Sequence, residues 1–175
     1  MLANKIKETL RDVPDFPKPG IIFKDITPIL KDPKLCEEIA AALASQLEHL
    51  RIDVVAGIES RGFLFGLALA QKLNVAFVPI RKAGKLPYKT VQQSYDLEYG
   101  SATLEIHEDA FFKGQSVLIH DDLLATGGTV VAASQLVNQL GAEVAGYSFL
   151  ISLDFLNGRE RLNSFSENVF SLATF

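Results

Sequence analysis

The chain has 175 residues, 48% of them hydrophobic, which suits one domain over residues 1–175 with a sizeable core. Its formal net charge of −4 argues against a nucleic-acid surface, and its one cysteine excludes a disulfide framework within the chain. No apolar run reaches the length of a membrane span, and the charged N-terminus lacks the apolar stretch of a signal peptide. We therefore expect a cytoplasmic protein that binds neither nucleic acid nor membrane.

Helical and extended patterns alternate along the chain. Apolar positions at helical spacing predict helices over residues 4–13, 34–50, 62–73 and 130–140. Apolar runs typical of strands cover residues 54–58, 75–80, 95–99, 102–106, 117–120, 144–153 and 169–172, with a short extended segment at 21–23 and a polar loop at 81–94. Because most of these strands are continuously apolar, they favour an α/β fold with a mostly parallel central sheet and helices on both faces.

The most informative stretch runs from Ser116 to Thr129, where an apolar run ends in two adjacent carboxylates, Asp121 and Asp122. A loop of small and hydroxyl-bearing residues follows, made of Ala125, Thr126, Gly127, Gly128 and Thr129. Glycines let backbone N–H groups approach an anion, and the start of the next helix adds positive charge, so this loop suits a phosphate. The two acids would repel a phosphate and suit hydroxyls or a hydrated Mg²⁺ instead. Together they predict a site for a phosphorylated sugar.

Simpler interpretations exist for each part of this stretch. Two glycines after a strand are about as often only a tight turn, and paired aspartates are often solvated. The pattern is neither a Walker motif, which needs a following Gly-Lys-Ser/Thr, nor a dinucleotide-binding fingerprint, which needs a third glycine. The prediction of a phosphorylated-sugar site therefore rests on the order of strand, acidic pair, glycine loop and helix.

Residues 117–129 resemble the phosphoribosyl-pyrophosphate (PRPP) motif of the type I phosphoribosyltransferases, especially of members that use adenine. The resemblance implies that residues 125–129 hold the 5-phosphate of PRPP and that Asp121 and Asp122 bind the ribose hydroxyls. One position departs from the pattern, since His120 stands where an aliphatic residue is expected. For it we favour a strand-end histidine with a local hydrogen bond over a metal-binding or catalytic role. Further matches to the family follow in order at residues 15–26, 57–63, 81–87 and 97–100.

A second segment, at residues 56–62, also stands between a predicted strand and a predicted helix. By itself it is more often a helix start with Ser60 as the N-cap. The resemblance implies a pyrophosphate-binding loop made by Glu59, Ser60 and Arg61, with a cis peptide between the first two residues and a catalytic role for Arg61.

The basic segment after residue 80 supplies Arg81, Lys82 and Lys85. Charged loops with glycine and proline are usually solvated hairpin tips. The resemblance implies a mobile lid whose cations stabilise the departing pyrophosphate. It also implies a homodimer, with Arg81 reaching the site of the neighbouring subunit.

The remaining site residues also come from the resemblance. Glu98 could face solvent on an edge strand, but the resemblance implies catalytic acid/base chemistry on the purine, with Tyr99 approaching the site from the same lid. An N-terminal hood is implied to bind adenine, and the residues that match it and the far wall of its pocket are Ile22, Phe23, Lys24 and Leu153. Members of the family usually have arginine where Lys24 stands.

These features predict a purine-salvage enzyme that transfers the phosphoribosyl group of PRPP to adenine, giving AMP and pyrophosphate. The resemblance implies Mg²⁺ as the cofactor, held mainly through PRPP and water with no direct protein ligand. One alternative is the same chemistry on another base. The other is a non-catalytic PRPP-sensing regulator that binds nucleic acid, which the acidic charge and single-domain length disfavour.

Overall fold

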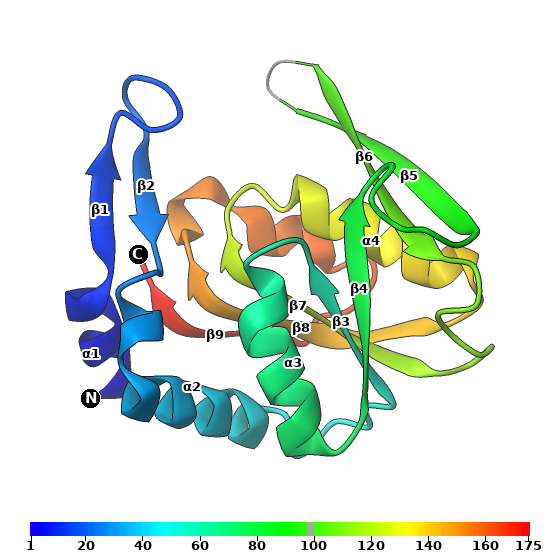
Figure 1. Cartoon of the computed structure of the whole chain (residues 1–175), viewed down its shortest axis with the longest axis horizontal. Coiled ribbons are helices and arrows are strands. Elements are labelled where there is room, and N and C mark those ends of the chain that lie inside the picture. Colours follow the sequence, from blue (N-terminus) through cyan, green and yellow to red (C-terminus); the bar gives the residue numbers. More distant parts are fainter. Residues whose placement is uncertain (98–99) are drawn as a thin grey trace.

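The computed structural model describes residues 1–97 and 100–175, and within them seven strands form one sheet in the order β5-β6-β4-β3-β7-β8-β9. The five strands β4, β3, β7, β8 and β9 run parallel, while β5 and β6 form an antiparallel hairpin at one edge. A separate two-stranded ribbon, β1-β2, stands at the opposite side of the molecule, beside the C-terminus (Figure 1). The expected α/β fold with a mostly parallel sheet is therefore confirmed.

The elements have the following bounds. The helices are α1 (Leu2–Thr9), α2 (Pro33–Gln46), α3 (Gly62–Leu73) and α4 (Gly128–Gln139), with short 3-10 helices η1 (Ile29–Lys31), η2 (Asp154–Leu156) and η3 (Gly158–Leu162). The strands are β1 (Arg11–Pro14), β2 (Ile22–Asp25), β3 (Val54–Ile58), β4 (Ala76–Lys82), β5 (Thr90–Asp96), β6 (Ser101–His107), β7 (Ser116–Leu124), β8 (Glu143–Ser152) and β9 (Val169–Thr174).

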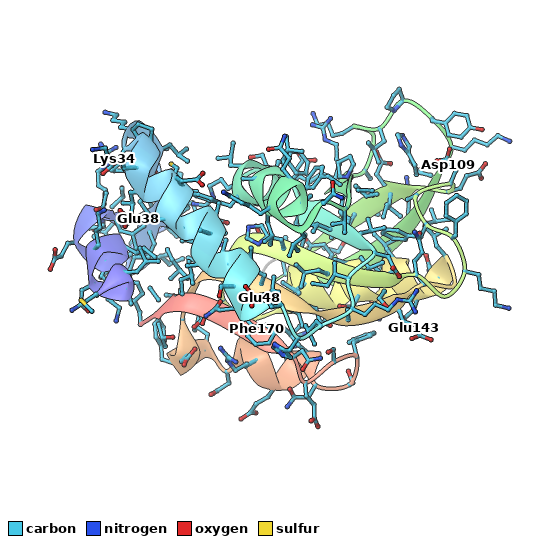
Figure 2. All side chains as sticks on the ribbon, turned by 90° about the horizontal axis from the view of Figure 1, so that it is seen from below. Lys34, Glu38, Glu48, Asp109, Glu143 and Phe170 are labelled. Carbon is cyan, nitrogen blue, oxygen red and sulfur yellow. The ribbon has the colours of Figure 1, made fainter. Side chains whose placement is uncertain are left out.

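The central strands bury both of their faces. In β7, Val117 and Ile119 pack on the side of α4, while Leu118 packs on the side of α2 and α3, because successive side chains of a strand point to opposite faces. Helix α2 supplies Ile39 and Leu43 to the second core and presents Lys34 and Glu38 at its exposed side (Figure 2). This two-sided burial explains why the strands are continuously apolar in sequence.

Several predicted bounds differ from the structure, and each difference has a local cause. Residues 11–13, predicted as the end of the first helix, instead belong to β1, because they pair antiparallel with β2. The predicted polar loop at 81–94 is shortened from both ends, since β4 continues to Lys82 and β5 begins at Thr90. Strand β7 continues to Leu124, so Asp121 and Asp122 lie within its carboxyl-terminal part and not beyond it. The bounds of β3 and α3 agree with the prediction.

No helix in residues 1–97 and 100–175 is long and apolar enough to cross a lipid bilayer.

We predict that Asp32→Ala lowers the free energy of unfolding by about 1 kcal/mol, because this residue caps α2. The Asp32 carboxylate accepts hydrogen bonds from the backbone N–H groups of Lys34 and Leu35, both at 3.0 Å. Urea denaturation measures the change. Asp32→Asn, which keeps an acceptor oxygen, is the matched control, and equal stability of Asp32→Ala and wild type would contradict the capping role.

Candidate active site

The acidic pair lies at the carboxyl edge of the sheet, next to the loop that leads from β3 to α3. Strands β3 and β7 are parallel neighbours with Gly57 opposite His120, so both carboxyl ends reach the same edge. The backbone N–H of Asp122 donates to Asp121 Oδ1 at 2.8 Å. Arg61 Nε lies 3.0 Å from Asp122 Oδ2, in an ion pair whose carboxylate side chain is only 4% exposed. Parallel strand ends are the usual place for ligands in such sheets.

The electrostatics of the pair favour retention of a proton. Burial raises the pKa of Asp121 well above its usual value, and the neighbouring charge of Asp122 raises it further. Burial also raises the pKa of Asp122, although the guanidinium of Arg61 opposes this shift. Two carboxylates so close together cannot both lose their protons easily in the free protein. Hydroxyl groups or cations that arrive at this edge would offset that cost.

The β3–α3 loop packs directly against the end of β7, and a glycine makes this approach possible. A Cβ on Gly62 would lie 2.9 Å from the His120 carbonyl oxygen and 3.0 Å from Asp121 Oδ1, closer than a side chain tolerates. The peptide between Glu59 and Ser60 is cis, as the resemblance implied. The loop is therefore held where Arg61 can reach the acidic pair.

Glu59 binds the segment that carries two of the predicted cations. Its Oε2 accepts hydrogen bonds from the Lys82 backbone N–H at 2.7 Å and from Arg81 Nε at 3.3 Å. Arg81 also donates from Nη1 to the Lys85 carbonyl at 3.3 Å. Glu59, predicted to bind pyrophosphate, is thus placed as a partner of Arg81 within its own chain.

The loop predicted to bind phosphate joins β7 to α4. Gly127 has φ of 82°, a conformation that favours glycine, and α4 begins at the next residue. The first N–H groups of a helix have no partner inside it and point outward. Thr129 Oγ1 donates to the Tyr95 hydroxyl at 3.4 Å, which places β5 beside the loop.

The β1-β2 ribbon approaches the same edge through Phe23. The Arg61 guanidinium lies 4.7 Å from the centroid of the Phe23 ring, and its Nη1 donates to the Lys24 carbonyl at 3.3 Å. The ammonium of Lys24 lies away from this contact, 2.7 Å from Asp12 Oδ1 and 4.2 Å from the ring centroid of Phe175. Arg61 therefore links the ribbon to the acidic pair, whereas the Lys24 side chain takes no part in that link.

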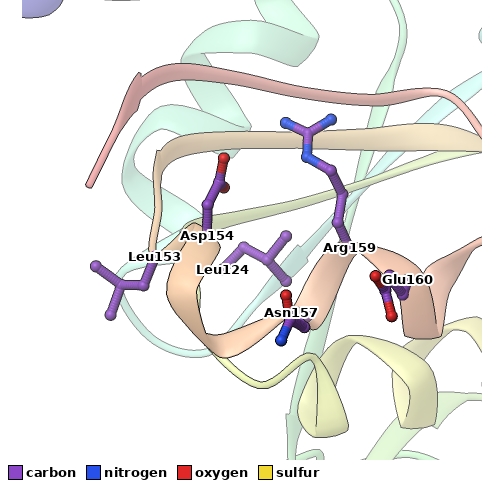
Figure 3. Close-up of a pocket in the computed structure, with 7 residues that line it drawn as sticks. Leu124, Leu153, Asp154, Asn157, Arg159 and Glu160 are labelled. Carbon is purple, nitrogen blue, oxygen red and sulfur yellow. The ribbon is translucent and has the colours of Figure 1, made fainter.

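Leu153 lies at the end of β8, on the other side of the loop. Its backbone N–H donates to the Leu124 carbonyl at 2.9 Å, and both side chains line a cavity of about 220 Å³ with Asp154 and residues 157–160 (Figure 3). Ile22, in contrast, is 57% exposed at the start of β2. The predicted place of Leu153 in a base pocket with the hood stays a prediction.

A buried carboxylate binds the backbone of the basic segment. Glu105, on β6, is 2% exposed and its Oε1 accepts from the backbone N–H groups of Lys85 and Leu86 at 2.8 and 2.7 Å. Burial by itself would raise the pKa of Glu105, but the backbone donors of this turn outweigh it and hold the pKa below its usual value. The lysine-bearing turn is therefore tied to the sheet.

His120 lies in the middle of β7 and not at its end. It is fully buried, and a Cβ on Gly66 of α3 would lie 3.4 Å from its Cδ2. Burial lowers the pKa of the imidazole to about 4, with the Ser148 backbone acting in the opposite direction. Neither ring nitrogen has a hydrogen-bond partner of good geometry among the described residues. The residue is a neutral core group beneath the acidic pair.

Glu98 and Tyr99 lie outside the described residues, so their predicted roles stay predictions.

Three residues that border the site were not predicted from the sequence. Tyr95 and Arg161 contact the phosphate loop, and Glu105 braces the basic turn. For Glu105, the sequence offers one hint of a special role, which is a charged residue inside an otherwise apolar strand. For the other two, only the tertiary packing brings them to the loop.

Known proteins share both this fold and this site-bearing region. The family model of the phosphoribosyl transferase domain matches residues 25–164. The chain therefore belongs to the phosphoribosyl transferase family. Among its relatives, the adenine phosphoribosyltransferase of Acidobacterium capsulatum is 57% identical over 167 residues, which cover 95% of this chain and 91% of the relative.

Solved structures agree with the family membership. The crystal structure of adenine phosphoribosyltransferase from Thermoanaerobacter pseudethanolicus matches with a TM-score of 0.96 and 51% identity, covering 100% of both chains. That of the Saccharomyces cerevisiae enzyme, complexed with adenine and an imino-altritol bisphosphate, matches with a TM-score of 0.91 and 44% identity, covering 98% of both chains.

We predict that Asp121→Asn melts higher than the wild type at pH 7, by about 2 °C or more. The carboxyl has a raised pKa in the folded protein, so the wild type loses stability as the pH rises from the usual carboxyl range to the folded pKa. An amide removes that loss and keeps an acceptor for the Asp122 N–H. Thermal melts between pH 4 and pH 8 should show the advantage of the variant growing with pH and then levelling off.

The exposed Asp109→Asn is the charge-matched control and should melt like the wild type. A lower melting temperature of Asp121→Asn at pH 7 would contradict the proposed cost of the buried pair.

We predict that Glu105→Ala costs about 1–3 kcal/mol of stability, because two backbone donors lose their acceptor. Since the folded pKa is lowered, the carboxylate stabilises the protein above the usual carboxyl pKa, and this contribution fades as the pH falls through the folded pKa. Urea denaturation at pH 7 and at pH 4 measures both effects. The exposed Glu108→Ala should stay within about 0.5 kcal/mol of the wild type. An equal loss for both variants would remove the bracing role of Glu105.

Proposed function

We propose that this protein transfers the 5-phosphoribosyl group of PRPP to adenine, giving AMP and pyrophosphate in purine salvage. One observation carries the proposal. Arg61 contacts both the buried acidic carboxylate of Asp122 and the ring of Phe23, so the segments predicted for pyrophosphate, ribose and base converge on one side chain. The adenine phosphoribosyltransferase of Saccharomyces cerevisiae, with which this chain shares 44% identity, binds adenine and a sugar-like bisphosphate.

The proposed binding mode divides PRPP among three segments. The loop of residues 125–129 takes the 5-phosphate on the free N–H groups at the start of α4. Asp121 and Asp122 accept hydrogen bonds from the ribose hydroxyls. The loop of Glu59, Ser60 and Arg61, together with Lys82 and Lys85, receives the pyrophosphate, and Arg81 binds the pyrophosphate of the neighbouring subunit. Adenine lies against Phe23, with Ile22, Lys24 and Leu153 as the other residues of its pocket.

In this proposal Mg²⁺ is held mainly through the substrate and water. The described residues contain no group of three His, Cys, Asp or Glu side chains that could hold a metal by themselves. Asp122 Oδ2 makes no hydrogen bond within the described residues besides its ion pair with Arg61, so it can still accept one from a metal-bound water. When bound, Mg²⁺ would neutralise part of the pyrophosphate charge.

The reaction follows from this placement. The C1–O bond of PRPP breaks and pyrophosphate leaves with the electron pair, while the adenine N9 forms the new bond to C1. Positive charge develops on the ribose, where the neighbouring acidic pair stabilises it. The N9 proton passes to Glu98, which follows β5, the strand whose Tyr95 borders the phosphate loop. Closing of the lid with Tyr99 would exclude water, which competes for C1.

The proposal also covers the oligomeric state and the cellular location of the protein. We place the protein in the cytoplasm as a homodimer, in which Arg81 exchanges its partner Glu59 for the pyrophosphate of the neighbouring subunit. Its guanidinium is held by one carboxylate at 3.3 Å, a contact that an incoming pyrophosphate can replace.

The function is tested by an assay of AMP formation. Purified protein with PRPP, Mg²⁺ and adenine should release pyrophosphate and AMP in equal amounts. Hypoxanthine, guanine and xanthine should react at least about a hundredfold more slowly, because unpaired polar groups in a base pocket are strongly penalised. Absence of AMP, or faster reaction with another base, would overturn the assignment.

We predict that Asp122→Asn lowers kcat by about 10²–10³, because the positive charge that develops on ribose loses one of the two neighbouring carboxylates. The protein should stay folded by circular dichroism, and the Asp109→Asn variant should keep full activity. An undiminished kcat/KM would remove the acidic pair from the mechanism.

A further inference from the structure

The outer side of the phosphate loop is covered by η3, which is far from it in sequence. A Cβ on Gly158 would overlap the Ala125 carbonyl oxygen, and one on Gly127 would lie 2.9 Å from the Gly158 carbonyl oxygen. The two backbones are therefore in direct contact. The following Leu162 is fully buried and anchors η3 in the core beside α4. This segment is thus a fixed wall of the loop.

Arg161 belongs to η3 and contacts the phosphate loop. It follows Gly158 by three residues, one turn of a 3-10 helix, so both lie on the side that faces the loop. Its Nη1 donates to the Thr126 carbonyl at 3.2 Å and lies 3.6 Å from the position of a Cβ on Gly128, the first residue of α4. Arg159, two residues earlier, instead donates to the Val169 carbonyl and points toward β9 (Figure 3).

The charge of Arg161 has the wrong sign for the place where it lies. A helix N-terminus carries partial positive charge, so a cation there is unfavourable unless an anion accompanies it. Within the described residues, Arg161 forms no ion pair with a carboxylate. Arg161 is exposed to solvent, and a strong anion in the loop would give its charge a favourable partner.

We infer that Arg161 is a positioning residue for the 5-phosphate: it clamps the Thr126 carbonyl and adds a full positive charge beside the phosphate loop. The inference rests on the proposed function and assigns a role outside residues 125–129. It acts on the phosphate end of PRPP and AMP and leaves the base and the pyrophosphate to the other segments. Because the charge lies next to the loop at one end of the ligand, its effect belongs in substrate affinity and not in the chemical step.

The experiment measures binding of ribose 5-phosphate, which lacks both base and pyrophosphate, by calorimetry. Arg161→Met and Arg161→Gln should weaken its binding about five- to tenfold, as loss of a charge-assisted contact near the surface does. Arg161→Lys, which keeps the charge, should stay within about twofold of the wild type. Arg51→Met, an exposed arginine that pairs with Asp53, removes the same charge elsewhere and should have no effect.

Kinetics separate a positioning role from a structural one. In Arg161→Met the KM for PRPP should rise by the same factor, while kcat and the KM for adenine stay within about twofold of the wild type. Raising the salt concentration should weaken ribose 5-phosphate binding more in the wild type than in this variant.

Two results would overturn the inference while leaving the proposed function intact. One is wild-type affinity in Arg161→Met or Arg161→Gln, and the other is a lysine variant as weak as the methionine variant. Failure of the wild type itself to bind ribose 5-phosphate and to form AMP would overturn the proposed function instead.

Discussion

The site depends on one ion pair, between Arg61 and the nearly buried carboxylate of Asp122. A carboxylate out of water is costly, and a second one beside it adds repulsion. The Arg61 guanidinium offsets part of this cost, but only because Gly62 lets its loop approach the end of β7 without a side chain between them. The same guanidinium holds the β1-β2 ribbon through the Lys24 carbonyl and the Phe23 ring. A single cation thus sets the relative position of strand end, loop and hood.

The parallel register of the sheet makes that arrangement possible. Strand β3 lies between β4 and β7, so the loops that follow these strands emerge side by side at one edge. The strands are buried on both faces, and α3 and α4 each begin at this edge with three residues between the end of the preceding strand and the helix. Consequently, segments that lie far apart in sequence supply the proposed phosphate, ribose and pyrophosphate contacts without any long unstructured connection. Under the proposed function, the charge of the substrate meets backbone N–H groups and cations that the sheet has already positioned.

Strands and helices could be predicted from the sequence where the local residue pattern agrees with the contacts made in the folded protein. Strand β3 and helix α3 were predicted with the bounds that the structure has, because an all-apolar run and a glycine start leave few alternatives. Helical spacing wrongly predicted residues 11–13 as helix, since Val13 continues the spacing of Ile6 and Leu10. Only the pairing with β2 makes this segment a strand. The polar start of β5, at residues 90–94, could not be predicted as a strand because it owes its strand structure to pairing with β6. Arg161 could not be predicted at all, because nothing near it in sequence points to the Thr126 carbonyl. The roles of Glu98 and Tyr99 rest on the resemblance alone.

The contact between Glu59 and Arg81 has a consequence for turnover. In the free protein the arginine already has an anionic partner, at 3.3 Å, so its charge is not left bare when the site is empty. Under the proposed function, a pyrophosphate group must displace that carboxylate to gain the arginine, and the carboxylate can reclaim it afterwards. Under the proposed function, Glu59 therefore competes with the leaving group for Arg81, which makes product release easier at the expense of tight binding. An enzyme whose product carries several negative charges gains turnover from such an exchange of anions.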